Sequence, residues 1–494
     1  MGHAYSSIVA DVFARFKRLD GYKVYFLTGT DEHGLKIQKA ADENRQEPKL
    51  FCDIISKTFR DLTKILNLSN DDFIRTTEKR HHKAVQFLWN KLVSKKYIYL
   101  SKYRGWYSVS DEAYYHENEI TEKDGKKISI NSGSIVEWVE EESYFFKLSL
   151  FQDKLLNFYE KNSDFILPIS RKNEVISFVK GGLKDLSVSR KSFSWGIKVP
   201  DNDEHVIYVW LDALTNYLSA LNYPNYEDVL FKKFWPANLH IIGKDILRFH
   251  AVYWPAFLLA ADILPPNRVY GHGWILSDEK KMSKSKGNIL DPLEMINNYG
   301  LDQLRYYLIK EVSFGNDGNI SNKNVENCIN SDLANNYGNF CQRTFAFAEK
   351  NCKGLVPSDI DFISKDLKIL NSFSDNIKKI RSLMDKQQLN DYVKFIIERS
   401  FEANKYFNDE APWNKKTDIK RLNTIIYVSL EIIRKISILL LPIIPDSANK
   451  ALRSLNLDTK NLKLDSVSNH LLIKSGSKLN NQGILFKKIK KRND

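Results

Sequence analysis

The sequence predicts an α/β fold built on buried parallel strands, with an inserted module and a long α-helical region after it. Three observations carry this prediction. A helix-periodic stretch at residues 8–19 is followed by an apolar strand at 24–27. The strand pattern stops over residues 97–200, where short apolar runs alternate with turn residues, and it resumes at 206–210 and 239–243. After residue 322 almost every segment has helical periodicity.

The first elements are predicted by the spacing of their apolar residues. Ile8, Val12, Phe16 and Leu19 follow one another at spacings of 4, 4 and 3 residues. This spacing places them on one buried face of a helix. Gly21 ends this helix. The following apolar run is typical of a strand buried in a parallel sheet. It leads into residues 28–34 (TGTDEHG), a loop where ligands are expected because they bind at the carboxyl ends of such strands.

Composition limits the class of protein and its partners. The chain has 494 residues, 43% hydrophobic and 27% charged, which excludes a disordered chain or a disulfide scaffold. The net charge of +13 indicates a polyanionic partner, with a basic surface kept for solubility as the alternative. Four scattered cysteines fit free thiols in a reducing compartment, and no signal or membrane segment is predicted. We therefore expect a cytoplasmic protein.

The segment at residues 280–288 (KKMSKSKGN) is the strongest single motif. It contains four lysines within seven residues, together with two serines and a glycine. Such a cationic loop can fold over a polyphosphate and neutralise the charge of departing pyrophosphate. A solvated lysine-rich loop is the alternative for charge alone.

Several strings resemble class I aminoacyl-tRNA synthetases, and among them the methionyl-tRNA synthetase family. Residues 281–285 (KMSKS) match one class signature, and residues 1–5 (MGHAY) are similar to the end of the other, HIGH. Further matches in the same order are residues 28–34 (TGTDEHG), 208–214 (YVWLDAL), 243–246 (GKDI), 249–256 (FHAVYWPA) and 313–318 (SFGNDG). The resemblance covers essentially the whole chain. It implies activation of methionine with ATP and transfer to the 3′ end of tRNA(Met).

The resemblance also implies a domain order. It predicts a Rossmann-like catalytic domain split by a connective insert, followed by an α-helical anticodon-binding domain. The expected segments are the catalytic halves at residues 1–96 and 201–275, the zinc-free insert at 97–200, the KMSKS and stem-contact segment at 276–330, the anticodon domain at 331–470 and a basic tail at 471–494.

Residues matching the class signatures are expected to bind ATP and stabilise its transition state. Gly2 lets adenine approach the backbone, and His3 lies at a helix N-terminus that favours phosphate oxygens. The resemblance assigns catalysis to His3, Lys281 and Lys284, with Mg²⁺ accompanying ATP. The full set expected to bind ATP is Gly2, His3, Gly243, Asp245, Lys281, Ser283 and Lys284.

A second set is expected to bind methionine. Asp31 would pair with the α-ammonium group, although a helix-capping aspartate is the alternative reading of this residue. An aromatic wall suits a thioether, and the residues expected to form it are Trp210, Ala213, Tyr217, Ile246 and His250. Taken singly, Trp210 and Tyr217 fit a hydrophobic core as well.

A third set is expected to read the tRNA anticodon. Asn339 and Arg343 are four residues apart and so share a helix face, and Trp413 follows a proline. By resemblance Trp413 would stack on the first anticodon base while Asn339 and Arg343 bond base edges. A polar pair on a helix surface and a packed tryptophan are the alternatives.

The length and composition of the insert distinguish this chain from other class I enzymes. The insert is too short for the editing module of leucyl, isoleucyl or valyl enzymes. Residues 97–200 contain no cysteine and one histidine, His116, so we expect no zinc. A monomer is expected, since no appended dimerisation module is recognised. A non-catalytic RNA-binding relative is the alternative function, and methionine-dependent ATP–pyrophosphate exchange separates the two.

The start of the chain carries one more expectation. The family's HIGH signature begins with another histidine, after a strand that would lie centrally in the sheet. Without that strand its neighbours would keep unpaired buried backbone groups, each costing about 1–3 kcal/mol. We therefore expect either that the functional polypeptide starts before Met1 or that the 494-residue chain folds poorly and is nearly inactive.

Overall fold

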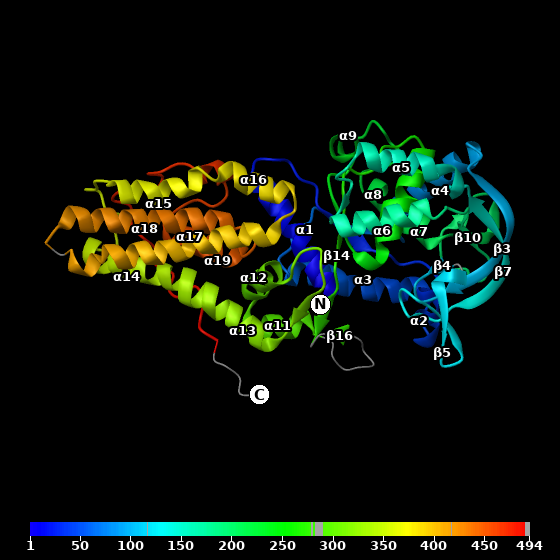
Figure 1. Cartoon of the computed structure of the whole chain (residues 1–494), viewed down its shortest axis with the longest axis horizontal. Coiled ribbons are helices and arrows are strands. Elements are labelled where there is room, and N and C mark those ends of the chain that lie inside the picture. Colours follow the sequence, from blue (N-terminus) through cyan, green and yellow to red (C-terminus); the bar gives the residue numbers. More distant parts are fainter. Residues whose placement is uncertain (116, 278–279, 282–289, 416, 490–494) are drawn as a thin grey trace. The chain divides into compact units, whose positions relative to one another are not determined.

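The computed structural model describes the chain except residues 116, 278–279, 282–289, 416 and 490–494, and except the side chains of residues 103, 114, 280 and 281. It divides into two compact units (Figure 1). Unit 1 comprises residues 1–24 and 272–494, and unit 2 comprises residues 25–271.

Parallel strands of unit 2 form two separate sheets. β1 pairs in parallel with β2, and β14 pairs in parallel with β8 in a sheet of order β13-β14-β8. These strands are β1 (Leu27–Thr30), β2 (Asp72–Arg75), β8 (Ile166–Leu167), β13 (His240–Gly243) and β14 (Val269–His272). Helices connect them: α2 (Leu35–Glu43), α3 (Pro48–Ile65), α4 (Lys79–Ser94), α5 (Gln152–Lys161), α6 (Ile169–Lys180), α7 (Val209–Leu214), α8 (Asn216–Ser219), α9 (Val229–Phe234) and α10 (Trp254–Ala260).

Two predicted strands are shifted in the structure. The strand expected at 24–27 begins only at Leu27, because the backbone N–H of Phe26 bonds the Asp71 side chain, and ladder pairing starts with Leu27 opposite Asp72. The strand expected at 206–210 ends at Ile207, because α7 starts two residues later. An apolar run of this length does not distinguish a buried strand from a buried helix.

The insert is built on two long antiparallel strands, residues 98–108 and 137–146. Ile98 faces Phe146 at one end of the β3–β7 ladder, and Tyr107 faces Glu137 at the other. Its strands, and those that join it to the second half of unit 2, are β3 (Ile98–Ser108), β4 (Ala113–Tyr115), β5 (Ile120–Lys123), β6 (Lys126–Ser129), β7 (Glu137–Phe146), β9 (Leu186–Ser187), β10 (Ser189–Arg190), β11 (Lys198–Val199) and β12 (Asn202–Ile207). The expected mixture of strands and helices is thus confirmed.

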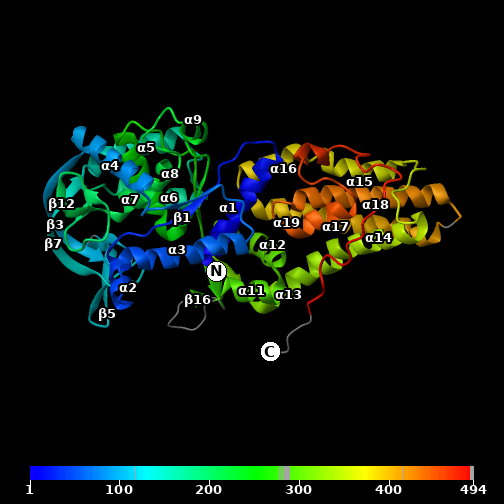
Figure 2. The same ribbon diagram turned by 180° about the vertical axis from the view of Figure 1, so that it is seen from behind.

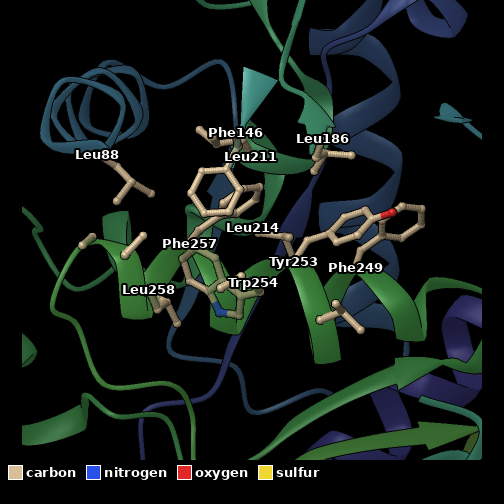
Figure 3. Close-up of a cluster of buried hydrophobic side chains, with 14 of the residues drawn as sticks. Leu88, Phe146, Leu186, Leu211, Leu214, Phe249, Tyr253, Trp254, Phe257 and Leu258 are labelled. Atoms are coloured by element: carbon tan, nitrogen blue, oxygen red, sulfur yellow. The ribbon is translucent and has the colours of Figure 1, made fainter. Parts of the chain in front are cut away.

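One hydrophobic core holds unit 2 together. Trp254 and Phe257 of α10 are fully buried, and they pack with Leu211 and Leu214 of α7 and with Phe146 of the insert (Figure 3). Burial of such side chains stabilises the folded state by about 1.5–3 kcal/mol each. Because α7 and the segment before α10 carry predicted site residues, this core fixes the scaffold of the site.

Unit 1 begins with α1 (Gly2–Leu19), whose buried face contains the predicted Ile8, Val12, Phe16 and Leu19. A small sheet of order β16-β15-β17 follows, made of β15 (Ile275–Ser277), β16 (Lys280–Lys281) and β17 (Gly318–Ile320). At Gly273, a Cβ atom would come within 2.2 Å of the Asn316 backbone, so only glycine fits this approach.

The rest of unit 1 is a helical bundle around α18, which is buried along most of its length (Figures 1 and 2). Side chains of neighbouring helices bond to it, as in the hydrogen bond from Tyr392 to the Leu439 carbonyl. The helices are α11 (Pro292–Tyr299), α12 (Leu301–Glu311), α13 (Asn322–Cys328), α14 (Asn339–Cys352), α15 (Ser364–Ser374), α16 (Ile377–Asp385), α17 (Leu389–Glu410), α18 (Ile419–Leu440) and α19 (Pro445–Ser454). None of the described helices is long and apolar enough to cross a membrane.

A buried ion pair joins α1 to α12 within unit 1. Asp11 accepts from Arg305 at 2.6 Å, with both side chains fully buried, and from the partly exposed Arg15 at 2.7 Å. We expect Asp11→Ala to lower the free energy of unfolding by about 3–5 kcal/mol, because it removes the carboxylate that bonds the fully buried Arg305 guanidinium. Arg15→Ala should cost only about 0–1 kcal/mol. Urea denaturation checks both, and equally small losses would show that the buried pair adds little.

Candidate functional site

The loop after β1 carries Asp31 beside two other carboxylates. Although part of Asp31 is accessible to solvent, the protein packed around it raises its pKa well above the ordinary value, and Glu112 and Asp212 add to this shift. A carboxylate that is costly to ionise alone is a favourable partner for a cation. This loop therefore offers a site for a positively charged group at the end of a parallel strand.

Glu112 reaches the same loop from the insert. Gly34 lies at φ +108°, and a Cβ there would be 2.3 Å from a Glu112 carboxylate oxygen, so the loop and the insert touch at this point. Burial raises the pKa of Glu112 to about 7, while the nearby Lys36 and Arg190 oppose the shift. Arg190 is itself buried, 4.7 Å from the Tyr208 ring centre.

The aromatic residues expected to line a pocket lie close together. Trp210 on α7 stacks on Phe249 with ring centres 3.8 Å apart and planes 9° apart. The His250 ring is 6.3 Å from Trp210, and Ala213 lies one helical turn after Trp210 on α7. The indole N–H of Trp210 is buried and has no hydrogen-bond partner among the described residues. These contacts form an apolar wall.

A hydrogen-bond chain fixes the polar edge of that wall. The Ile246 carbonyl is 3.0 Å from His250 Nδ1, and the Tyr217 hydroxyl is 2.8 Å from His250 Nε2. Burial lowers the pKa of His250 to about 4, so the ring is neutral at pH 7. Nδ1–H therefore donates to Ile246, and Nε2 accepts from Tyr217. The wall is uncharged, as a thioether would require.

The residues expected to bind ATP are distributed over both units. In unit 2, Gly243 ends β13 and Asp245 follows in a short 3₁₀ turn. In unit 1, Gly2 and His3 begin α1, and Ser6 one turn later lies 2.6 Å from His272 Nε2.

The KMSKS segment is described only at its start. Lys281 pairs with Leu276 in the β15–β16 ladder. Ser283 and Lys284 lie outside the described residues. Their assignment to ATP therefore stays a prediction.

Within the helical part of unit 1, Arg343 and Trp413 lie together. The Arg343 guanidinium is 5.9 Å from the Trp413 ring centre and 5.0 Å from that of Phe407. Trp413 rests against Phe347 and Phe407 but stays 41% exposed, which leaves surface free for stacking. Asn339 is one turn before Arg343 on α14.

Sequence reasoning missed several residues of these sites. Glu112 and Phe407 contact or face predicted residues, but no local pattern singled them out. Phe249 lies in the matched string at residues 249–256 but was given no role of its own. The aromatic wall and the Arg343–Trp413 cluster share one structural signal, a π-helical segment, which is often found at functional sites. One covers Phe249–Tyr253 and contains His250. The other covers Ile329–Gly338 and directly precedes Asn339.

Two family models together match nearly the whole chain. A model described as tRNA synthetases class I (M) matches residues 1–345. A model described as anticodon binding domain of methionyl tRNA ligase matches residues 356–494.

Individual relatives match over similar lengths. A methionine–tRNA ligase of Rickettsia felis is 52% identical over 491 residues, covering 98% of this chain and 95% of that protein. The one of Brucella melitensis is 50% identical over 454 residues, covering 92% and 88%. A structure of Mycobacterium tuberculosis methionyl-tRNA synthetase bound by methionyl-adenylate has a TM-score of 0.95 and 44% identity, covering 98% of this chain and 96% of that one.

Proposed function

Because the chain belongs to the methionyl-tRNA synthetase family, we propose here which of its residues carry each part of that family's reaction. Its activity is that of a methionine–tRNA ligase, an ATP-dependent enzyme with a class I catalytic domain and an anticodon domain. The methionine carboxylate attacks the α-phosphorus of ATP, which forms methionyl-adenylate and releases pyrophosphate. The terminal ribose hydroxyl of tRNA(Met) then takes the methionyl group.

Asp31 holds the α-ammonium group of methionine, and the wall of Trp210, Ala213, Tyr217, Ile246 and His250 receives the side chain. The observation that supports this most is the neutral His250 bonded to Tyr217, beside the Trp210–Phe249 stack. Sulfur–aromatic contacts contribute about 0.3–1.5 kcal/mol each. Methionine-dependent ATP–pyrophosphate exchange tests the assignment, since it requires amino-acid and ATP binding but no tRNA.

Positioning and charge stabilisation account for the chemical step, and no side chain acts as a nucleophile. At the start of α1, Gly2 lets adenine approach the backbone and His3 binds ATP phosphates, while Gly243 and Asp245 bind the adenosine. Lys281 and Lys284 neutralise the charge of the departing pyrophosphate, and Ser283 also binds ATP. Mg²⁺ enters with ATP, because polyphosphates are its usual ligands.

The helical bundle recognises the anticodon of tRNA(Met) through Asn339, Arg343 and Trp413. The exposed Trp413 face supports stacking of an unpaired base, and the adjacent guanidinium supports bonding to a base edge. The net charge of +13 suits a nucleic-acid partner.

We expect Trp413→Ala to lower the rate of tRNA charging about 5- to 150-fold while leaving ATP–pyrophosphate exchange unchanged, because one stacked base is worth about 1–3 kcal/mol. Phe401→Ala is a matched control, since Phe401 is 53% exposed on α17 and is not assigned to tRNA. Equal loss of charging and exchange in Trp413→Ala would show that Trp413 only packs.

Three further properties complete the proposal. The insert works without zinc, since residues 97–200 contain no cysteine and only His116, which lies outside the described residues. The enzyme acts as a monomer. Its four free cysteines suit the reducing cytoplasm.

A further inference from the structure

A fully buried carboxylate on α7 is bonded by two histidines from other elements. Asp212 lies 2.6 Å from His33 Nδ1 and 2.7 Å from His81 Nε2, and the Asp212 and His81 side chains have no exposed surface. Burial alone would raise the pKa of Asp212, but the two histidines outweigh it and hold the pKa below its ordinary value. An ionised carboxylate only accepts, so both ring nitrogens donate.

These bonds connect the two ends of the proposed methionine site. His33 follows Asp31 by two residues, in the loop after β1. Asp212 stands between Trp210 and Ala213 on α7, and its side chain therefore joins the ammonium-binding loop to the helix that carries the aromatic wall.

A further bond extends the connection to α8. His81 on α4 uses its second ring nitrogen to reach Ser219, 2.9 Å away and two residues beyond Tyr217. The described contacts thus form one buried network, which runs from the loop through Asp212 and His81 to α8.

We propose that Asp212 is a positioning residue that sets the distance between Asp31 and the side-chain wall, and thereby selects the amino acid by length. The proposal rests on the assignment of Asp31 and the wall given above. A binding pocket distinguishes two amino acids that differ by one methylene group by a factor of only about 10 to 200 in kcat/KM. A small displacement between Asp31 and the side-chain wall is therefore enough to reduce this preference. Because Asp212 and His81 are fully buried, their hydrogen-bonded network fixes the surrounding side chains in one arrangement.

Asp212→Asn tests the proposal, because asparagine keeps the shape but can accept from only one of the two histidines. We expect the methionine KM to rise roughly 10- to 100-fold with an unchanged ATP KM, as a misplaced substrate-binding group predicts. We also expect the preference for methionine over ethionine, one methylene longer, to shrink. Asp366→Asn is the control: Asp366 is equally buried, in the helical bundle with Arg421, and should lower Tm without changing the methionine KM.

The charge of Asp212 could itself attract the ammonium group, and variants of His33 separate this effect from positioning. His33→Asn keeps an N–H at the place of Nδ1, so it should raise the methionine KM less than His33→Leu does. His33→Leu loses the bond but leaves the Asp212 carboxylate, and it should raise the methionine KM and reduce the preference over ethionine.

Unchanged KM and unchanged preference in both Asp212→Asn and His33→Leu would overturn the proposal, whatever the change in Tm. Asp31→Asn distinguishes this failure from failure of the proposed function. If Asp31→Asn also leaves the methionine KM unchanged, the assignment of the pocket is wrong. If Asp31→Asn raises it, only the positioning role is overturned.

Discussion

Lys284→Ala should lower kcat for methionine-dependent ATP–pyrophosphate exchange about 10²- to 10³-fold. This corresponds to a loss of roughly 3–4 kcal/mol of transition-state stabilisation, by analogy with loss of one transition-state donor. The lysine charge matters mostly as pyrophosphate develops, so methionine affinity should stay nearly unchanged. Lys284 lies outside the described residues, and the prediction depends on the KMSKS string, whose first residue, Lys281, ends β16. Steady-state exchange kinetics measure both quantities.

Lys280→Ala is the matched control, because it removes one positive charge just before the KMSKS string. We expect it to change kcat far less than Lys284→Ala. A Lys284→Ala enzyme with normal kcat and only weakened methionine binding would refute the assignment.

Asp31→Asn should have the largest effect on methionine binding. Asp31 is exposed in the structure, and bound methionine would cover it. Removing one partner of a charge pair that binding desolvates costs about 2–5 kcal/mol, so kcat/KM for methionine should fall about 30-fold or more while the KM for ATP changes little. The N-cap of α2 is Gly34, so Asp31 does not cap this helix. If Asp31 only holds its own loop through the hydrogen bond from the His33 backbone, the variant should lower Tm and leave the methionine KM alone.

The pH dependence of methionine binding gives an independent test of Asp31. Its raised pKa means that protons compete with the ammonium group for the carboxylate. As pH falls through that pKa, the carboxylate becomes neutral, so the methionine KM should rise toward low pH, by at most about tenfold per pH unit. This rise should be lost in Asp31→Asn. A pH-independent KM in the wild type would contradict the assignment.

Local periodicity predicted the first helix well and the strands less well. The buried face of α1 is the one that the spacing of Ile8, Val12 and Phe16 indicates. The run at 206–210 also looked like a strand, but its second half begins α7. Tertiary packing decides such cases, because both a buried strand and a buried helix are apolar throughout.

The site could be predicted only where its residues lie in recognisable strings. Trp210 and His250 belong to such strings, and the structure brings their rings together. Glu112 could not be found in this way, because it contacts the Asp31 loop from about 80 positions away through the insert. The Asp212 network likewise joins residues 131 and 179 positions apart, a separation at which no sequence period operates.

Methionine-dependent ATP–pyrophosphate exchange by the native polypeptide tests the account most directly. We predict that label from pyrophosphate enters ATP when methionine is present, and that leucine, isoleucine or valine gives little exchange. The same preparation should charge tRNA(Met). Binding of tRNA(Met) without any methionine-dependent exchange would contradict the account and identify an RNA-binding protein instead.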